Sequence, residues 1–287
     1  MTNEIDYLLI GHMTADLTPD GRVLGGTVSY AARTVTALGL RVGVVTSTLP
    51  DDPLLDELRP YTVDVVTLPA EDTSTFENVY TDGRRQQYIR GVAKPLTYDD
   101  VPVAWRAAPL VHFGPLTGEI TPSTLFPQFE GATRLLTAQG LLRQWGDNGI
   151  VHFKPWADPT ALAHLDWLVL SEEDIEAAPE LESTYAAKVT NFVLTRAERG
   201  GTHYYNEQPS TYDTPQVEVL QPTGAGDVFA AALLAGLHLL DGDATRALAM
   251  AAALGANAVT RPGLEGTPTI DEAQDLLHRI RTAKDAD

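Results

Sequence analysis

The sequence predicts an α/β fold in which helices flank a doubly wound, mainly parallel sheet, with a small β-hairpin beside it. Short apolar runs alternate with helix-like segments through most of the chain, which is typical of a parallel sheet covered on both faces. Residues 73–92 break this alternation, because two extended runs flank Asp82-Gly83 and such a pair favours a hairpin turn. Near the C-terminus, two apolar helical patterns follow each other directly.

Each element can be justified in chain order. Buried strands are expected where β-branched and apolar residues cluster before a glycine or a polar turn, and helices where the apolar period is longer. The hairpin at 73–92 either projects as a flap or forms an ordinary sheet edge. Residues 201–205 and 217–220 are expected to pair as an antiparallel edge of the sheet. The expected strands are 5–10, 22–24, 41–46, 63–67, 110–113, 134–137, 167–170 and 192–195, and the expected helices are 28–38, 53–58, 227–240, 244–259 and 269–283.

Composition narrows the range of functions. The chain has 287 residues, of which 44% are hydrophobic, so it can bury a large core. Its formal net charge of −19 argues against nucleic acid and anionic membranes as partners. It has no cysteine, which excludes disulfides and thiolate metal sites. With no signal-like segment at its start and no long apolar run, a cytoplasmic protein is expected.

The most informative stretch is Pro222 to Asp227, where a turn with two glycines opens an apolar helix. The unpaired N–H groups at a helix start hold anions, and Gly224, Ala225 and Gly226 let an anion approach the backbone closely. Asp227 is well placed to accept a proton from a hydroxyl that attacks a phosphate. The pattern therefore indicates phosphoryl transfer from a nucleotide to an alcohol, while a plain helix cap at Asp227 is the alternative.

Several motifs, in their order along residues 5–280, resemble those of the PfkB carbohydrate kinases of the ribokinase-like superfamily. The double glycine that opens a helix and the turn before Asp227 resemble the two signatures of that family. The matching positions are Asp16, Gly25-Gly26 with Tyr30 and Leu38-Gly39, Asp51-Asp52-Pro53, the 73–92 hairpin, Ser171 to Asp174, Thr195 with Gly200, Pro222 to Asp227, Asn257 and Pro262-Gly263.

The resemblance implies one ribokinase-like domain over residues 1–287, with a lid formed by about 12–24 and 73–92. It implies that Asp227 is the general base and that the 224–227 backbone is the anion hole. Gln139 is added because it follows a strand end, where open α/β sheets bind ligands. The expected substrate-binding residues are Asp16, Gly25, Gly26, Tyr30, Phe76 and Gln139; the nucleotide-binding residues are Thr195, Gly200, Thr223, Asn257 and Gly263; and Glu172 and Asp174 are expected to hold magnesium through water.

These observations predict a kinase that uses ATP and Mg²⁺ to phosphorylate a hydroxyl of a small sugar or polyol, as a monomer or as a homodimer through the lid. Tyr30 stands where the family usually has Asn, and its context is most similar to the myo-inositol kinase-like branch. A nucleoside kinase, with Phe76 or Tyr30 stacking on the base, and a 2-keto-3-deoxygluconate kinase are alternatives. A further alternative is an inactive binding or regulatory protein, favoured by Gln221, Ser171, Asp174 and Ala197, which replace common family residues.

Overall fold

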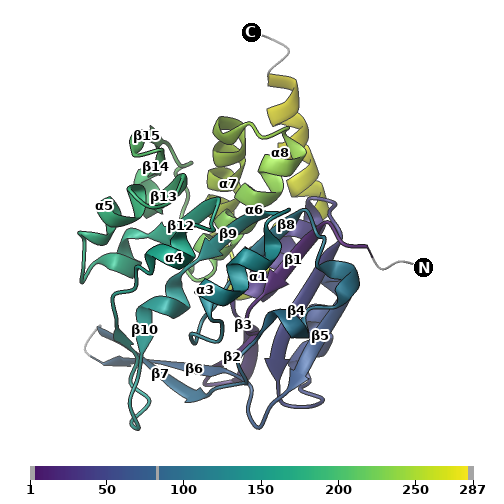
Figure 1. Cartoon of the computed structure of the whole chain (residues 1–287), viewed down its shortest axis with the longest axis vertical. Coiled ribbons are helices and arrows are strands. Elements are labelled where there is room, and N and C mark those ends of the chain that lie inside the picture. The colour runs from purple at the N-terminus through teal and green to yellow at the C-terminus, as the bar shows by residue number, and fades with distance from the viewer. Residues whose placement is uncertain (1–3, 82–83, 284–287) are drawn as a thin grey trace.

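The computed structural model describes residues 4–81 and 84–283. Within them, one large sheet has the order β15-β14-β13-β12-β9-β8-β1-β4-β5 (Figure 1). The strands from β13 to β5 are parallel, and β14 and β15 add an antiparallel edge. In sheet order the strands are Gln208–Tyr212, Gly201–Tyr205, Asn191–Thr195, Trp167–Ser171, Thr133–Thr137, Leu110–Phe113, Tyr7–Ile10, Val42–Thr48 and Asp64–Pro69.

This sheet is doubly wound, as the sequence predicted. The chain runs outward from β1 to β4 and β5, and then returns to add β8, β9, β12 and β13 on the other side of β1. The strand order therefore reverses between β1 and β8. Ligands of open α/β sheets bind at such a switch point, beyond the carboxyl ends of the strands.

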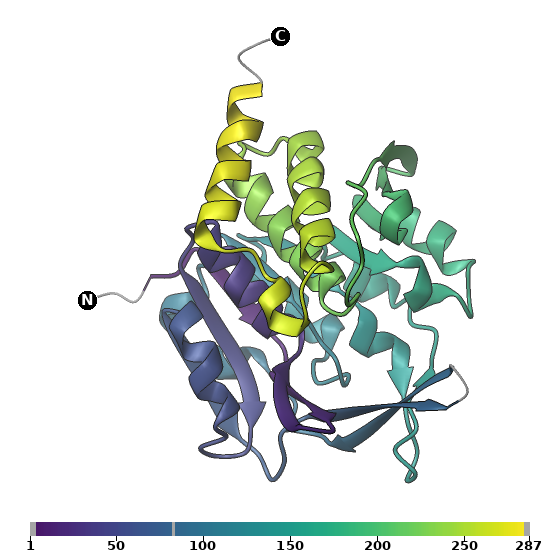
Figure 2. The same cartoon turned by 180° about the vertical axis from the view of Figure 1, so that it is seen from behind.

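Helices cover both faces of the sheet, and alternate residues of each strand serve the two cores. In β1, for example, Tyr7 and Leu9 join the core under the long helices, while Leu8 and Ile10 join the other core. Figures 1 and 2 show the long C-terminal helices together on one side. The first core includes α1 (Thr27–Ala37), α2 (Leu54–Leu58), α6 (Ala225–Leu239), α7 (Ala244–Ala258) and α8 (Ile270–Ala283), and the second includes α3 (Pro122–Leu125), α4 (Pro159–Leu162) and α5 (Leu181–Ala186).

A separate four-stranded sheet, here called the lid, lies across the end of the large sheet (Figure 1). Its order is β3-β2-β6-β7, with β2 at Thr14–Thr18, β3 at Gly21–Gly25, β6 at Thr75–Thr81 and β7 at Arg84–Gly91. It thus combines the two segments expected from the sequence, and the 73–92 hairpin projects rather than forming an edge of the parallel sheet. The expected turn at Asp82-Gly83 lies outside the described residues.

One expected strand is wrong. Residues 217–220 form no strand, and the partner of β14 is β15, at Gln208–Tyr212. The reason is a tight turn, since Asn206 and Glu207 both adopt left-handed backbone, with φ of 47° and 68°. Such a two-residue turn returns the chain at once as a hairpin. Across 4–81 and 84–283, none of the helices has the length and apolar character needed to cross a membrane.

Candidate active site

Two helices begin near the switch point, each directly after a glycine with a positive φ. Gly26 precedes α1 and Gly224 precedes α6, and both have a φ of 88°. Their ψ angles differ, at 152° for Gly26 and −9° for Gly224, but a positive φ favours glycine in both cases, which explains why a glycine stands at each helix start. The two helices pack against each other in the first core, so their N-termini meet at one place.

The two helix starts are joined by a hydrogen bond between side chains. Thr27 Oγ1 donates to Asp227 Oδ1 at 2.7 Å. Thr27 itself is supported by Gly114, which follows β8, because a Cβ there would lie only 2.7 Å from Thr27 Cγ2. Sequence reasoning missed Thr27, although its place directly after the double glycine, as the first residue of α1, was an available signal.

Asp227 has the properties of a general base. Burial raises the pKa of its carboxyl group to about 6. The hydrogen bond from Thr27 and the charge of Arg143 lower this pKa, whereas the charges of Asp174 and Asp16 raise it. A carboxylate with a pKa near 6 is ionised at neutral pH and is a stronger base than an ordinary aspartate.

Around Asp227, the α6 turn is open where a ligand would need access. Gly226 is exposed, and a Cβ built on it would meet nothing within 4 Å. The space on one side of Gly224 is filled by the ring of Tyr30, because a Cβ at Gly224 would overlap that ring. The backbone of 224–227 therefore presents the N-terminus of a 15-residue helix to the space above it, as the predicted anion hole requires.

The predicted acceptor residues gather at the start of α1. Asp16 lies on β2, and its carboxylate packs against Gly25, where a Cβ would lie 2.5 Å from Asp16 Oδ2. Tyr30 is buried on the first turn of α1, and burial together with the charges of Asp227 and Asp16 raises its pKa well above the usual value. The structure thus brings Asp16, Gly25, Gly26 and Tyr30 next to the α6 turn.

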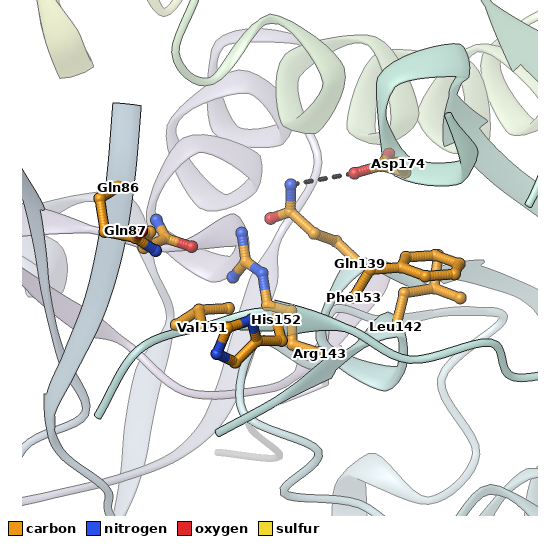
Figure 3. Close-up of a pocket in the computed structure, with 9 residues that line it drawn as sticks. All are labelled: Gln86, Gln87, Gln139, Leu142, Arg143, Val151, His152, Phe153 and Asp174. Carbon is orange, nitrogen blue, oxygen red and sulfur yellow. Dashed lines mark hydrogen bonds between the residues drawn. The ribbon is translucent and has the colours of Figure 1, made fainter. Parts of the chain in front are cut away.

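A pocket of about 290 Å³ lies between the lid and the end of the large sheet. Figure 3 shows Gln139 reaching across it, with its amide Nε2 3.2 Å from Asp174 Oδ1, and Arg143 in the centre. Gln139 was expected here, but Arg143 was not. Gln86 and Gln87 of β7 line the pocket from the lid. The other side is formed in and next to a short hairpin, whose strands are β10 (Arg143–Gln144) and β11 (His152–Phe153). Its lining residues are Leu142, Val151, His152 and Phe153.

Phe76 has a different environment from the one expected. It lies on β6 with only 3% of its surface exposed, packed with Ile89 and Leu116. The Arg143 guanidinium carbon lies 5.1 Å from the centre of its ring. One face of Phe76 is therefore covered by an arginine, which disfavours its stacking on a nucleobase.

The predicted nucleotide residues lie on several elements of the second half of the chain. Thr195 ends β13, Gly200 follows it with a φ of 78°, and Gly263 opens the loop after α7 with a φ of 48°. Gly263 N donates to Gln221 Oε1 at 2.8 Å. Gln221, which replaces the usual family aspartate, thus joins this loop to the segment before α6. Thr223 is exposed and Asn257 is partly buried near the end of α7.

The two predicted magnesium residues are both engaged in protein contacts. Asp174 forms a capping box with Ser171, accepting from Ser171 N at 2.9 Å and Ser171 Oγ at 2.8 Å. Glu172 forms an ion pair with Arg199. Within residues 4–81 and 84–283, three or more His, Asp or Glu side chains never gather as a metal site. A magnesium ion here would depend on the phosphates and water for most of its ligands.

Comparisons with known proteins show which kinases this chain is similar to. Residues 155–270 match the pfkB family carbohydrate kinase domain. A cytidine kinase of Thermococcus kodakarensis is 26% identical over 257 residues, which are 81% of this chain and 88% of that protein. The structure is also similar to solved ribokinase-family kinases. A pyrophosphate-dependent kinase complexed with a pyrophosphate analog and myo-inositol has a TM-score of 0.77 and 24% identity, covering 91% of this chain and 98% of that one.

Ribokinase of Arabidopsis thaliana, solved with ribose and ATP, has a TM-score of 0.75 and 17% identity, covering 96% of this chain and 99% of that one. Residues 155–270 are thus similar to the pfkB family carbohydrate kinases, and the chain as a whole has a ribokinase-like fold. The members of that carbohydrate kinase family are phosphotransferases.

Proposed function

We propose that this chain transfers the γ-phosphoryl group of ATP to a hydroxyl of a small polyol or sugar. The observation that carries the proposal is the hydrogen bond from Thr27, at the start of α1, that holds Asp227 at the open start of α6, beside Asp16. In-line phosphoryl transfer needs mainly a positioned hydroxyl, a proton acceptor and compensation of charge. Asp16 would orient the acceptor, Asp227 would take the proton of its hydroxyl, and the 224–227 backbone would bind the transferred phosphoryl group.

The nucleotide would lie along Thr195, Gly200, Thr223, Asn257 and Gly263. The exposed Gly226, beside which a Cβ would meet nothing within 4 Å, supports an approach of the nucleotide phosphates to the start of α6. Asp174, and Glu172 after release from Arg199, would hold a magnesium ion through water, and that ion would supply positive charge to balance the phosphates. Every other role in the proposal belongs to side chains and backbone groups of this chain.

Nucleosides are a second candidate class of acceptor. The relative from Thermococcus kodakarensis is a cytidine kinase, and Phe153 in the pocket wall is an aromatic residue that a base would contact. Tyr30 is less suited, since its ring already packs against Gly224. The polyol is favoured because the pocket is lined mostly by polar side chains.

The test is a matrix of donors and acceptors with the purified protein. The donors are magnesium-ATP and magnesium-pyrophosphate, because a similar fold serves a pyrophosphate-dependent kinase. The acceptors are myo-inositol, ribose, 2-keto-3-deoxygluconate and cytidine, with products detected by ³¹P NMR. We expect turnover with ATP and a polyol or sugar, with myo-inositol first. A preference for cytidine would show that the acceptor is a nucleoside and not a polyol or sugar. A preference for pyrophosphate would show that ATP is not the phosphoryl donor. Binding without turnover would favour the inactive binding or regulatory protein.

A further inference from the structure

A second cavity, of about 1000 Å³, lies at the other end of the large sheet, here called the lower cavity. Four of its lining residues are the first residues of β8, β9, β12 and β13: Leu110, Thr133, Trp167 and Asn191. These strands are parallel, so the lower cavity lies at their amino ends, whereas the candidate active site lies beyond their carboxyl ends. Its volume is at the upper end of the range for small-molecule sites. The lower cavity is therefore separate from the candidate active site.

Part of the wall of the lower cavity is apolar and aromatic. Leu110, Trp167 and Leu237 line it with side chains that are otherwise buried. Tyr205 of β14 also lines it, and its side chain is 57% exposed. A ligand with an apolar or aromatic body would remove this surface from water. Tyr and Trp rings also attract cations through their negative faces.

The charged groups around the lower cavity favour a cation. Its acidic residues are Glu130 and Asp241, and among the described residues that line it there is no lysine or arginine. The last turn of the 15-residue helix α6 also lines it, and adds the negative end of a helix dipole. The positive end of α7 is near as well, but the Asp243 carboxylate caps it by accepting from Arg246 N at 3.0 Å. An anion would therefore be repelled here.

His203 adds a hydrogen-bond acceptor to the wall. It is only 7% exposed and stacks on Trp167, with ring centres 5.1 Å apart. Asn191 Nδ2 donates to Asp166 O at 3.1 Å, so Asn191 Oδ1 accepts from His203 Nε2, also at 3.1 Å. Burial lowers the pKa of His203, so its ring is neutral at neutral pH and Nδ1 keeps a lone pair. Within the described residues Nδ1 has no partner, yet it is not one of the fully buried unpartnered atoms, so it is accessible from the cavity.

We propose that the lower cavity is a second binding site, which takes a small primary amine with an apolar or aromatic body. The ammonium group donates a hydrogen bond to His203 Nδ1, and the carboxylates of Glu130 and Asp241 balance its charge. The body of the ligand packs on Leu237 and the Tyr205 ring. Binding is noncovalent and uses no group of the candidate active site, so this inference does not depend on the proposed function.

The first experiment compares three probes of similar shape by isothermal titration calorimetry with the full-length protein. Phenethylamine carries both the charge and the N–H donors. Its N,N,N-trimethyl derivative keeps the charge without a donor, and phenethyl alcohol has no charge. We expect phenethylamine to bind about tenfold or more tightly than the alcohol, the scale of a lost charge-assisted hydrogen bond. It should bind about fivefold more tightly than the trimethyl derivative, the scale of one hydrogen bond.

The second experiment changes the wall. Glu130→Gln and Asp241→Asn remove one exposed charge each and should each weaken phenethylamine binding about two- to fivefold. Glu176→Gln is the matched control, because Glu176 is an exposed glutamate directly after a short 3₁₀ helix, as Glu130 is, but lies outside the cavity. It should leave the affinity unchanged. His203→Phe keeps a ring beside Trp167 without the acceptor, so it should remove the preference over the trimethyl derivative. The two surface variants remain informative if this core variant does not fold.

Amide chemical shifts of the ¹⁵N-labelled protein locate the probe. Shifts at Tyr205, Leu237 and Gly242 are expected, since these residues line the lower cavity. Shifts centred on Gln139 and Gly226 would mean that the acidic groups of the active site attract the amine, and would overturn the inference. Equal affinity for the amine and the alcohol would also overturn it, and equal affinity for the trimethyl derivative would reject a primary amine. A loss in Glu176→Gln as large as that in Glu130→Gln would show only general attraction to a chain with a net charge of −19.

Discussion

The starts of helices α1 and α6 each follow a glycine with a positive φ, but they differ in what surrounds them. Both follow a glycine with a φ of 88°. The α1 turn is filled by protein groups, because a Cβ at Gly26 would lie 2.9 Å from His12 O and one at Gly25 would lie 2.5 Å from Asp16 Oδ2. The α6 turn is open on one side, because a Cβ at Gly226 would meet nothing within 4 Å.

This difference shows how two helix starts that each follow a glycine can serve different purposes. At α1, the close packing fixes Asp16 and places Thr27 against Asp227, so the turn positions side chains. At α6, the open turn leaves backbone N–H groups accessible, so the turn is suited to bind an anion from outside the protein. The part of the site near the α1 turn, where the acceptor is expected to bind, should therefore be rigid and selective for its substrate. The part at the α6 turn, where the phosphate donor is expected to bind, should be accessible to the donor.

The largest effect is expected from Asp227→Asn. The amide cannot accept the proton of the acceptor hydroxyl, so kcat should fall by at least about 10²-fold, whereas the affinity for ATP should stay within a few-fold. Steady-state kinetics and a separate nucleotide-binding measurement distinguish the two parameters. Turnover near the wild-type value would leave Asp227 as a helix cap and would remove the functional difference between the two turns.

Asp16→Ala should have the next largest effect, on the acceptor alone. Asp16 is expected to accept hydrogen bonds from adjacent substrate hydroxyls, and each such charge-assisted bond contributes about 1.5–3 kcal/mol. The KM of the true acceptor should rise about 10- to 150-fold, and the preference over its deoxy analogue should approach unity. The KM of ATP should barely change. Discrimination that survives in the variant would show that the closed turn does not select the acceptor.

The pH dependence should show a smaller effect that depends on the contact between the two turns. The pKa of Asp227 is raised to about 6, so the base is ionised above that pH and protonated below it. kcat/KM should therefore fall about tenfold for each pH unit below 6. Thr27→Val removes a hydrogen bond that lowers this pKa, so its acidic limb should move to higher pH. An unshifted limb would mean that another group controls the profile.

The α6 turn could be predicted from the sequence because its chemistry is local. The glycines, the apolar helix and Asp227 are contiguous, and their order alone indicates an anion site with a base. The parallel sheet and the hairpin of the lid were predictable for the same reason, since each depends on a short periodic pattern.

The acceptor side could be predicted only in part because its contacts join distant segments. Thr27 and Asp227 are 200 residues apart. Arg143 reaches the pocket from a hairpin whose strands have two residues each, too short to give an alternating pattern. The apolar alternation of Val217 and Val219 suggested a strand, but the tight turn at Asn206 and Glu207 gave β14 another partner. Such choices depend on tertiary pairing, which local patterns do not encode.

The smallest effects should come from alanine at the two glycines of the α6 turn, measured by unfolding. Gly224→Ala should lower the free energy of unfolding by about 1–2 kcal/mol or more, because the residue must keep a positive φ and its Cβ would overlap the Tyr30 ring. Gly226→Ala lies inside the helix with open space beside it, so it should raise this free energy by about 0.5–1 kcal/mol. Yet Gly226→Ala should raise the KM of ATP, since the new methyl group narrows the approach to the backbone. A Gly226 variant with unchanged ATP kinetics would show that the phosphates do not approach this turn, and the open side of α6 would need another explanation.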